Sequence, residues 1–361
     1  MNWTVVFFTA IVLLFLLPLA PALLEWRNKR DAKPLKVVRE YDGNIKHFAM
    51  RFRQFLNEQF ADLVRDAGPA TISSSGRLPT GDSYQLVSGE GKPVFSEQEA
   101  ASATVSHLVL GTASLQLGDG MLYEKEVFAA GDIRVGNDNS FRALLAKGDI
   151  VLGEECDVLR WAHSDTRIEA GSKARLFGRM SANQELLLHR ETRFGRMHAP
   201  LVRFGEVLAP APAPAAVLVQ LEKPRDLLNE SAGRWLAKAD WAIPAASSHK
   251  GDLVARADMA IGDHSRIDGG IKSHGDLRIG AGVHVTGAVV CGGNMFIGPG
   301  CVIQGPVVCE HRIEIGAGTV LGSPQVETTV TAVEIRVREG ALAHGTVWAR
   351  ELGYVAPAIN A

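Results

Sequence analysis

Apolar and polar positions follow a fixed period in the second half of the chain. Ile-Gly pairs recur every 18 residues, beginning at Ile261, Ile279, Ile297 and Ile315. Two series of apolar positions recur every six residues: Ile279, Val285, Cys291, Ile297, Ile303, Cys309, Ile315 and Leu321, and Val283, Val289, Met295, Cys301, Val307, Ile313 and Thr319. Strand side chains alternate between faces, so both series can point inward. The pattern predicts a mainly β fold, a three-sided single-stranded parallel β-helix (β-solenoid) with glycines at its corners.

A second, less regular tract lies upstream. The segment Gly131–Gly136 (GDIRVG) is echoed 17 residues later by Gly148–Gly153 (GDIVLG), and Gly-Asp-Leu returns at Gly251 and Gly275. We expect one interrupted solenoid, with a first tract at 105–205 and a second at 251–350; two unrelated glycine-rich β regions are the alternative. A C-terminal tail would occupy 351–361.

The first 25 residues are expected to form a transmembrane anchor. Residues 1–24 carry no charged side chain, and 22 residues of helix would be about 33 Å long. A cleaved signal peptide is the alternative, although it would have a positive amino-terminal region. Positive residues follow instead, namely Arg27, Lys29, Arg30, Lys33, Lys36 and Arg39. The positive-inside rule then predicts a single-pass protein of the inner (cytoplasmic) membrane, with its N-terminus outside and its C-terminal domain in the cytoplasm.

Residues 26–104 are expected to contain this basic juxtamembrane segment, one amphipathic helix at 40–66 and a linker. Apolar residues fall at helical spacing, at Ile45, Phe48, Phe52, Phe55, Leu56, Phe60, Leu63 and Val64. We expect this helix to cap the first coil, because exposed solenoid ends promote edge pairing. A membrane-surface or self-association helix is the alternative.

Residues 206–250 interrupt the repeats. The run Ala209–Ala216 (APAPAPAA) predicts a stiff, extended spacer. Trp235, Leu236, Trp241 and Ile243 are expected to lay an apolar patch along one solenoid face. A partner-binding flap is the alternative.

Composition narrows the function. The 361 residues carry a net charge of −2, which gives no global field for binding nucleic acid. Cys291, Cys301 and Cys309 fall at core positions, so they are expected to be unpaired thiols in a reducing compartment. The pair Cys309 and His311 lacks a second ligand pair, so no metal site is predicted, nor any cofactor.

Four histidines are candidates for the base of an acyltransferase, because hexapeptide-repeat enzymes of that class are left-handed β-helices. They are His264, His274, His284 and His311, of which His264 is the best placed, near Asp263 and Asp268. We prefer to interpret these histidines as surface residues. The chain has no GxxxxGK[ST], GxSxG or HExxH motif, so no catalytic residue is assigned.

The Gly-Asp openings, the Ile-Gly corners and the spaced apolar residues at Gly131–Gly153 and Gly251–Gly345 resemble the bactofilin family. Bactofilins are bacterial polymer-forming cytoskeletal proteins. The resemblance covers about half of the chain and implies a right-handed β-helix that polymerises end to end without nucleotide near the inner membrane. The spanning segment, the long N-terminal region and the interruption depart from the family pattern.

These observations predict a non-enzymatic, membrane-associated scaffold that assembles through its solenoid ends. Its partners would be further copies of itself, the inner membrane and envelope or cell-shape proteins. The terminal coil is the expected contact, through Val333, Ile335, Val337, Leu342, Val347 and Trp348. The alternatives are an acyltransferase acting on a sugar or envelope precursor, and a passive adaptor whose insertion recruits an envelope enzyme.

Overall fold

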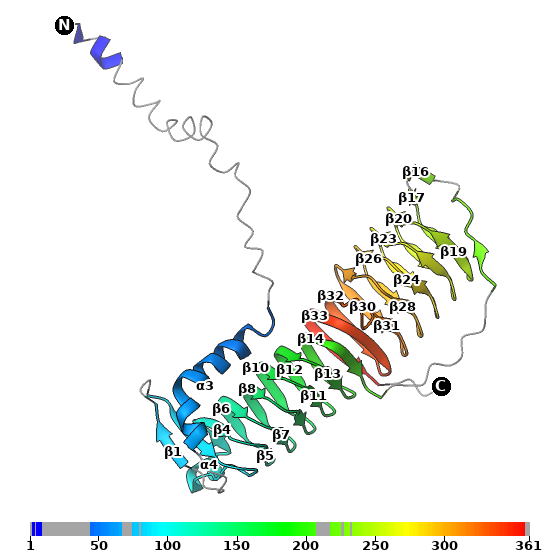
Figure 1. The fold of residues 1–361 in the computed structure, drawn as a ribbon. Coiled ribbons are helices and arrows are strands. Elements are labelled where there is room, and N and C mark those ends of the chain that lie inside the picture. Colours follow the sequence, from blue (N-terminus) through cyan, green and yellow to red (C-terminus); the bar gives the residue numbers. More distant parts are fainter. Residues whose placement is uncertain are drawn as a thin grey trace. The chain divides into compact units, whose positions relative to one another are not determined.

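The structure is a computed structural model that describes residues 2–3, 5–8, 44–66, 74–78, 81–206, 217–224, 227–231 and 233–357. Its main body begins at Ile45 and is a mainly β solenoid with few helices (Figure 1). The predicted anchor at 1–25 and the basic segment after it lie almost entirely outside the described residues. Among the described residues, no helix combines the length and the apolar character that crossing a membrane requires.

The first tract begins earlier than the sequence indicates, because β2 already pairs in parallel with β4. Strand β1 (Ser74–Arg77) is antiparallel to β2, and α4 (Glu97–Ser102) precedes β3. The strands of this tract are β2 (Ser83–Val87), β3 (Thr104–Val105), β4 (Leu108–Gly111), β5 (Leu115–Leu117), β6 (Leu122–Ala129), β7 (Ile133–Val135), β8 (Ser140–Ala146), β9 (Ile150–Leu152), β10 (Asp157–Ser164), β11 (Arg167–Ala170), β12 (Arg175–Ala182), β13 (Glu185–Leu188) and β14 (Arg193–Phe204).

The second tract has three short strands in each 18-residue repeat. Each pairs in parallel with the strand one repeat later, as Met259 does with Leu277. The strands are β17 (Arg234–Ala237), β18 (Trp241–Ile243), β19 (Ser247–Lys250), β20 (Leu253–Ala255), β21 (Met259–Ile261), β22 (Arg266–Asp268), β23 (Ile271–Ser273), β24 (Leu277–Ile279), β25 (His284–Val285), β26 (Val289–Cys291), β27 (Met295–Ile297), β28 (Val302–Ile303), β29 (Val307–Cys309), β30 (Arg312–Ile315) and β31 (Val320–Leu321).

The core confirms both six-residue series. Every member from Ile279 to Leu321 is at most 2% exposed, including the three cysteines. All four cysteines of the chain are free thiols. The Sγ atoms of Cys291 and Cys309 donate to backbone oxygens at the following corner, of Asn294 and Arg312, each at 3.3 Å. Ser273, one coil earlier, makes the same bond through its hydroxyl, so this column satisfies corner carbonyl groups as well as filling the core.

The Gly-Asp motif has a structural cause. The Asp276 carboxylate accepts a hydrogen bond from the N–H of Asn294, one coil on, at 2.7 Å. A Cβ on Gly293 would lie 2.2 Å from that carboxylate, so only glycine leaves room for it. Asp132, Gly148 and Asp149 repeat the arrangement in the first tract, where the bond is 3.0 Å long. The motif therefore links neighbouring coils at their corners.

The coil of β17 to β19 lies inside the range 206–250 that the sequence assigns to an insertion. Trp235 and Trp241 are each 7% exposed, and their rings stack with centroids 6.5 Å apart. They close the core at the outer end of the second tract and do not form the predicted patch on a lateral face. Strands β15 (Val219–Gln220) and β16 (Leu227–Ser231) pair with β19 and β17 and cover part of this end.

Helix α3 (His47–Asp66) lies along a lateral face of the first tract (Figure 1). From the sequence we expected it to cover the end of the first coil, and that expectation was wrong. Its buried residues Ala49, Leu56 and Phe60 pack on outward-facing side chains of successive coils. These side chains belong to one cluster: Leu86, Leu108, Leu110, Phe128, Ala143, Leu145 and Trp161. The helix shields an apolar outer face that would otherwise contact water.

Candidate functional site: the solenoid ends and an exposed ridge

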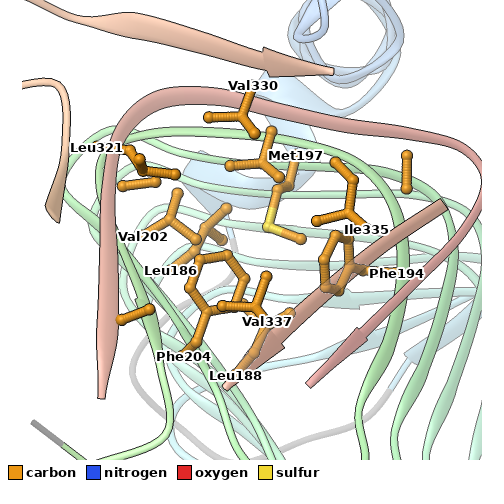
Figure 2. Close-up of a cluster of buried hydrophobic side chains, with 14 of the residues drawn as sticks. Leu186, Leu188, Phe194, Met197, Val202, Phe204, Leu321, Val330, Ile335 and Val337 are labelled. Carbon is orange, nitrogen blue, oxygen red and sulfur yellow. The ribbon is translucent and has the colours of Figure 1, made fainter. Parts of the chain in front are cut away.

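The last coils of the two tracts join each other within the chain. Strands β32 (Thr328–Arg338) and β33 (Ala341–Ala356) complete the second tract, and β33 pairs with β14 in antiparallel register. Met197 lies opposite Val347, and Phe204 opposite Ala341. Figure 2 shows Met197, Phe194 and Phe204 gathered with Ile335 and Val337 in one core. Two solenoid ends are thus joined by a β-ladder without a break in the apolar interior.

This junction corrects the expected assembly contact. Ile335, Val337 and Val347 are at most 1% exposed inside the single chain, so they offer no surface to another subunit. Trp348 differs, because it is 40% exposed and the Arg196 guanidinium lies 5.1 Å from the centre of its indole. Burial lowers the pKa of Arg196. The buried Ile335, Val337 and Val347 instead belong to the core in which the two tracts of one copy meet.

The outer end of the first tract is covered. Strand β1 pairs with the edge of β2, and Gly91 forms a parallel bridge to Leu115 on β5. Helix α4 precedes β3 and carries a capping box, in which Ser96 and Glu99 bond each other's backbone N–H groups. These segments, rather than α3, cap the first coil.

The outer end of the second tract keeps one open strand edge. The Trp241 N–H donates to Asp258 O at 3.0 Å, and Ile243 O accepts from Gly262 at 2.9 Å. Neighbouring residues of a strand direct their backbone groups to opposite sides, so the N–H and C=O of Ala242 point away from β21. Strand β18 pairs with no other described strand. The exposed Val217 and Val219 lie at the same end, on and just before β15.

The candidate acyltransferase histidines are not gathered with their acidic neighbours. Asp263 accepts from the N–H of Ala281, and Asp268 forms an ion pair with Arg266. His264 adopts a positive φ of 57° at a corner, and its imidazole occupies the space above Gly282. His284 is half-buried, which lowers its pKa, whereas His274 and His311 are exposed.

A serine, a histidine and a carboxylate that the repeat pattern did not single out lie in a row beneath α3. His163 Nδ1 is 2.8 Å from Ser181 Oγ, and its Nε2 is 3.4 Å from Asp165 Oδ1. Burial lowers the pKa of His163 to about 4. Ser181 is only 2% exposed, and Arg53 of α3 covers Asp165 at 2.7 Å. No substrate reaches this hydroxyl in the structure, so the row acts as a buried polar contact that holds the helix.

Two open grooves run along the lateral faces of the second tract. One groove, of about 590 Å³, crosses β18, β21, β24, β27 and β30. Asp240, Asp258 and Asp276 are among the residues that line it. These carboxylates bond the N–H groups of the next coil, so their position follows from the corner geometry. The other, of about 640 Å³, is lined by Val254, Lys272 and Val290 among others. Among the described residues, no group of three or more His, Cys, Asp or Glu side chains is arranged to hold a metal ion.

An apolar ridge marks the first tract and the junction. The register between paired strands shifts at equivalent positions of successive coils. The shifts lie between Val158 and Trp161, between Leu176 and Arg179, and between Phe194 and Arg196. β-Bulges of this kind push side chains outward. The exposed fractions are 46% for Leu159, 59% for Phe177 and 39% for Leu352. Phe48 of α3 is 44% exposed and lines one cavity of about 330 Å³ with Leu159 and Arg160.

No family model matches this chain, and comparison with curated proteins and with solved structures gives no match either.

Proposed function

We propose that this protein is a non-enzymatic scaffold of the bactofilin type, anchored in a membrane by residues 1–25, which pairs with a second copy through one end of its solenoid instead of polymerising at both ends. The assignment to that family, the right-handed winding and the placement of the solenoid in the cytoplasm are parts of the same proposal. The repeat pattern and the stacked parallel fold with an apolar core support the family assignment. The handedness follows from that resemblance alone, and the basic residues after the apolar run support the cytoplasmic placement.

One observation carries the assembly part of the proposal: the open edge of β18 at the outer end of the second tract. Unpaired backbone groups on a strand edge attract another strand. The junction of β14 with β33 is a precedent within the chain, since there two solenoid ends of this sequence join in antiparallel register. A second copy can meet β18 in the same way, across a two-fold axis.

This arrangement limits the assembly. The inner ends of the tracts are joined to each other, and β1 and α4 cover the outer end of the first tract. Among the described strands, an open edge is then left at one end of each chain, on β18. A pair of copies, rather than a filament, is the expected unit.

The backbone N–H of Ala242 provides the test. Ala242→Pro removes this donor but tolerates the edge-strand backbone, whereas Ala242→Val keeps the donor. We expect the full-length chain in detergent to sediment as a dimer. The valine variant should remain dimeric and the proline variant should be monomeric, with unchanged unfolding. A wild-type monomer, or a proline variant that stays dimeric, would contradict assembly at this edge.

The acyltransferase alternative gains no support from the described residues. The Asp263 carboxylate accepts a hydrogen bond from the N–H of Ala281, and Asp268 forms an ion pair with Arg266, so both carboxylates are engaged by groups other than His264.

A further inference from the structure

The exposed ridge combines large apolar side chains with arginines. We define it as Phe48, Leu159, Phe177, Trp348 and Leu352, with the arginines Arg160, Arg179, Arg196 and Arg350. The five apolar side chains are 39–59% exposed, which is unusual for leucine, phenylalanine and tryptophan that gather on one surface. They come from α3, β10, β12 and β33, so the fold, and not one amphipathic segment, brings them together.

The register of the strands places these residues beside each other. Val158 and Leu176 are ladder partners, so Leu159 and Phe177, which follow them, lie one coil apart. Phe194 on β14 is the ladder partner of Leu176, and Gly353 on β33 is the ladder partner of Phe194. Leu352, next to Gly353, therefore lies in the same column of strands as Phe177. Neighbouring coils are ~4.8 Å apart, so Leu159 and Leu352 are separated by roughly 14 Å along the solenoid axis.

The arginines give the ridge a positive character in a chain whose net charge is −2. The Arg179 guanidinium lies 4.9 Å from the centre of the Phe48 ring, and that of Arg196 lies 5.1 Å from the centre of Trp348. Arg160 and Arg350 are exposed beside Leu159 and Leu352. Glu126 is paired with Arg142, Glu351 is an acidic neighbour on β33, and Arg350 donates a hydrogen bond to the backbone oxygen of Glu310.

We propose that this ridge docks on the surface of a bilayer that contains anionic phospholipids. Aromatic and aliphatic side chains that alternate with arginine suit the headgroup region, where rings enter the acyl boundary and guanidinium groups bind phosphate. The mixture of exposed rings, leucine side chains and guanidinium groups therefore matches the surface of an anionic bilayer.

The position of the ridge on the chain supports this occupant. Phe48 lies four residues after Asn44, and the apolar run of the sequence ends at Leu24. Twenty residues span at most about 70 Å, so an anchor in the bilayer keeps the ridge within reach of the same surface. This inference rests on the proposed membrane anchoring, and it adds that the solenoid lies on the membrane by its side instead of standing away from it.

The test uses the full-length protein reconstituted in phosphatidylcholine vesicles, with and without a quarter of phosphatidylglycerol. An environment-sensitive fluorophore is attached at Phe177→Cys, or at Gln116→Cys on β5 as the control for an exposed residue of another face. The native cysteines are buried and should remain unlabelled. We expect a blue-shifted emission at position 177, quenched by lipid-borne quenchers, only with phosphatidylglycerol and reversed by high salt. Position 116 should stay in water.

A second pair of variants separates docking from folding. Leu159→Asp/Phe177→Asp should leave thermal unfolding unchanged but detach the ridge, reported by a fluorophore at Leu352→Cys. Val326→Asp, at an apolar residue that is also 59% exposed, should leave the Leu352 signal intact.

The outcomes distinguish the two proposals. Vesicles that carry the protein while position 177 stays in water would overturn the ridge and leave the anchor standing. Protein that floats with neither kind of vesicle would overturn both. A blue shift that depends on protein concentration and not on lipid would assign the ridge to contact between copies, and it would also overturn lipid docking.

Discussion

At the scale of single residues, the corner of each coil is held by a carboxylate that reaches the next coil. Asp252 shows its electrostatic consequence, because the hydrogen bond from the Gly270 N–H lowers the pKa of its carboxyl group. A charge-assisted bond of this kind is stronger than a bond between neutral groups. The same bond recurs in both tracts, so the acidic residues of the Gly-Asp motif have a structural role in stacking the coils.

Asp276 offers a direct test of this bond. Asp276→Ala removes the acceptor of the Asn294 N–H and should lower the free energy of unfolding by about 1 kcal/mol, as measured by urea denaturation. Asp276→Asn should lose less, because Asn137 accepts the N–H of Glu154 in the same way in the first tract. Equal stability of the alanine variant and the wild type would show that the corner bond contributes nothing.

The glycine that precedes each aspartate could be explained from the sequence only in part. Its recurrence indicates a corner, and a corner suggests a positive φ. Gly275 instead is needed because its Cβ would meet the Asp258 carboxylate of the previous coil. That close approach arises between residues one coil apart, and it becomes visible only once the coils are stacked.

At the scale of elements, the period of six was sufficient to predict the core, whereas the position of α3 was not predicted. Both series point inward as expected, because the alternation along each strand is a local property. The surface beneath α3 carries a signal that could have been used: Leu110, Phe128 and Leu145 are apolar at an outward phase and are ladder partners. An apolar outward column predicts a cover over that face.

The polar contact beneath α3 makes helix docking sensitive to acid. His163 on β10 faces Ser181 on β12 and Asp165, which directly follows its own strand. The charges near it are those of Asp165, Arg53 on α3 and Lys46 just before α3. Burial lowers the pKa of His163 from 6.5 to about 4, so the fold favours the neutral imidazole. The unfolded chain takes up the proton first, and stability is therefore lost as the pH falls from about 6.5 towards 4.

We expect the wild type to lose up to roughly 3 kcal/mol of unfolding free energy over this window. His163→Gln cannot titrate, so its stability should change less between pH 7 and pH 4.5. Urea denaturation at the two pH values measures the difference, and hydrogen exchange of residues 47–60 shows whether the helix is released. An equal loss in both proteins would assign the acid sensitivity to other groups.

At the scale of the whole molecule, the chain folds as two solenoids that meet by their C-terminal coils. The sequence predicted one interrupted solenoid and could not show that the second tract winds back towards the first. Repeats define the contacts between neighbouring coils only. The antiparallel pairing of β14 with β33 depends on which exposed ends fit, and neither strand contains a repeat signature that records it.

This topology sets a length for the connection between the tracts. Phe204 on β14 and Val219 on β15 lie in one column of strands, which continues from β14 through β33, β31, β28, β25, β22 and β19 to β15. Seven steps of ~4.8 Å separate these strands by roughly 34 Å. The chain from Glu206 to Val217 has eleven residue steps, and at ~3.1 Å per residue an extended proline-rich chain covers roughly 34 Å. The Ala-Pro run predicted as a stiff spacer lies outside the described residues, and its number of residues is what an extended chain needs to span the second tract.

Shortening this connection should therefore open the junction. Deletion of 210–213 leaves seven residue steps, which reach at most ~25 Å, so the second tract can no longer meet β14 of its own chain. Replacement of the same four residues by Gly-Ser-Gly-Ser keeps the length and serves as the control.

The readout is a disulfide between His198→Cys and Thr346→Cys, which are ladder partners across the junction. We expect crosslinked monomers from the control. The deletion should give crosslinked dimers or no crosslink, because a solenoid end released from its own chain can pair only with another copy. Efficient crosslinking within the shortened chain would contradict this length requirement, because the junction would then form with only seven residue steps between Glu206 and Val217.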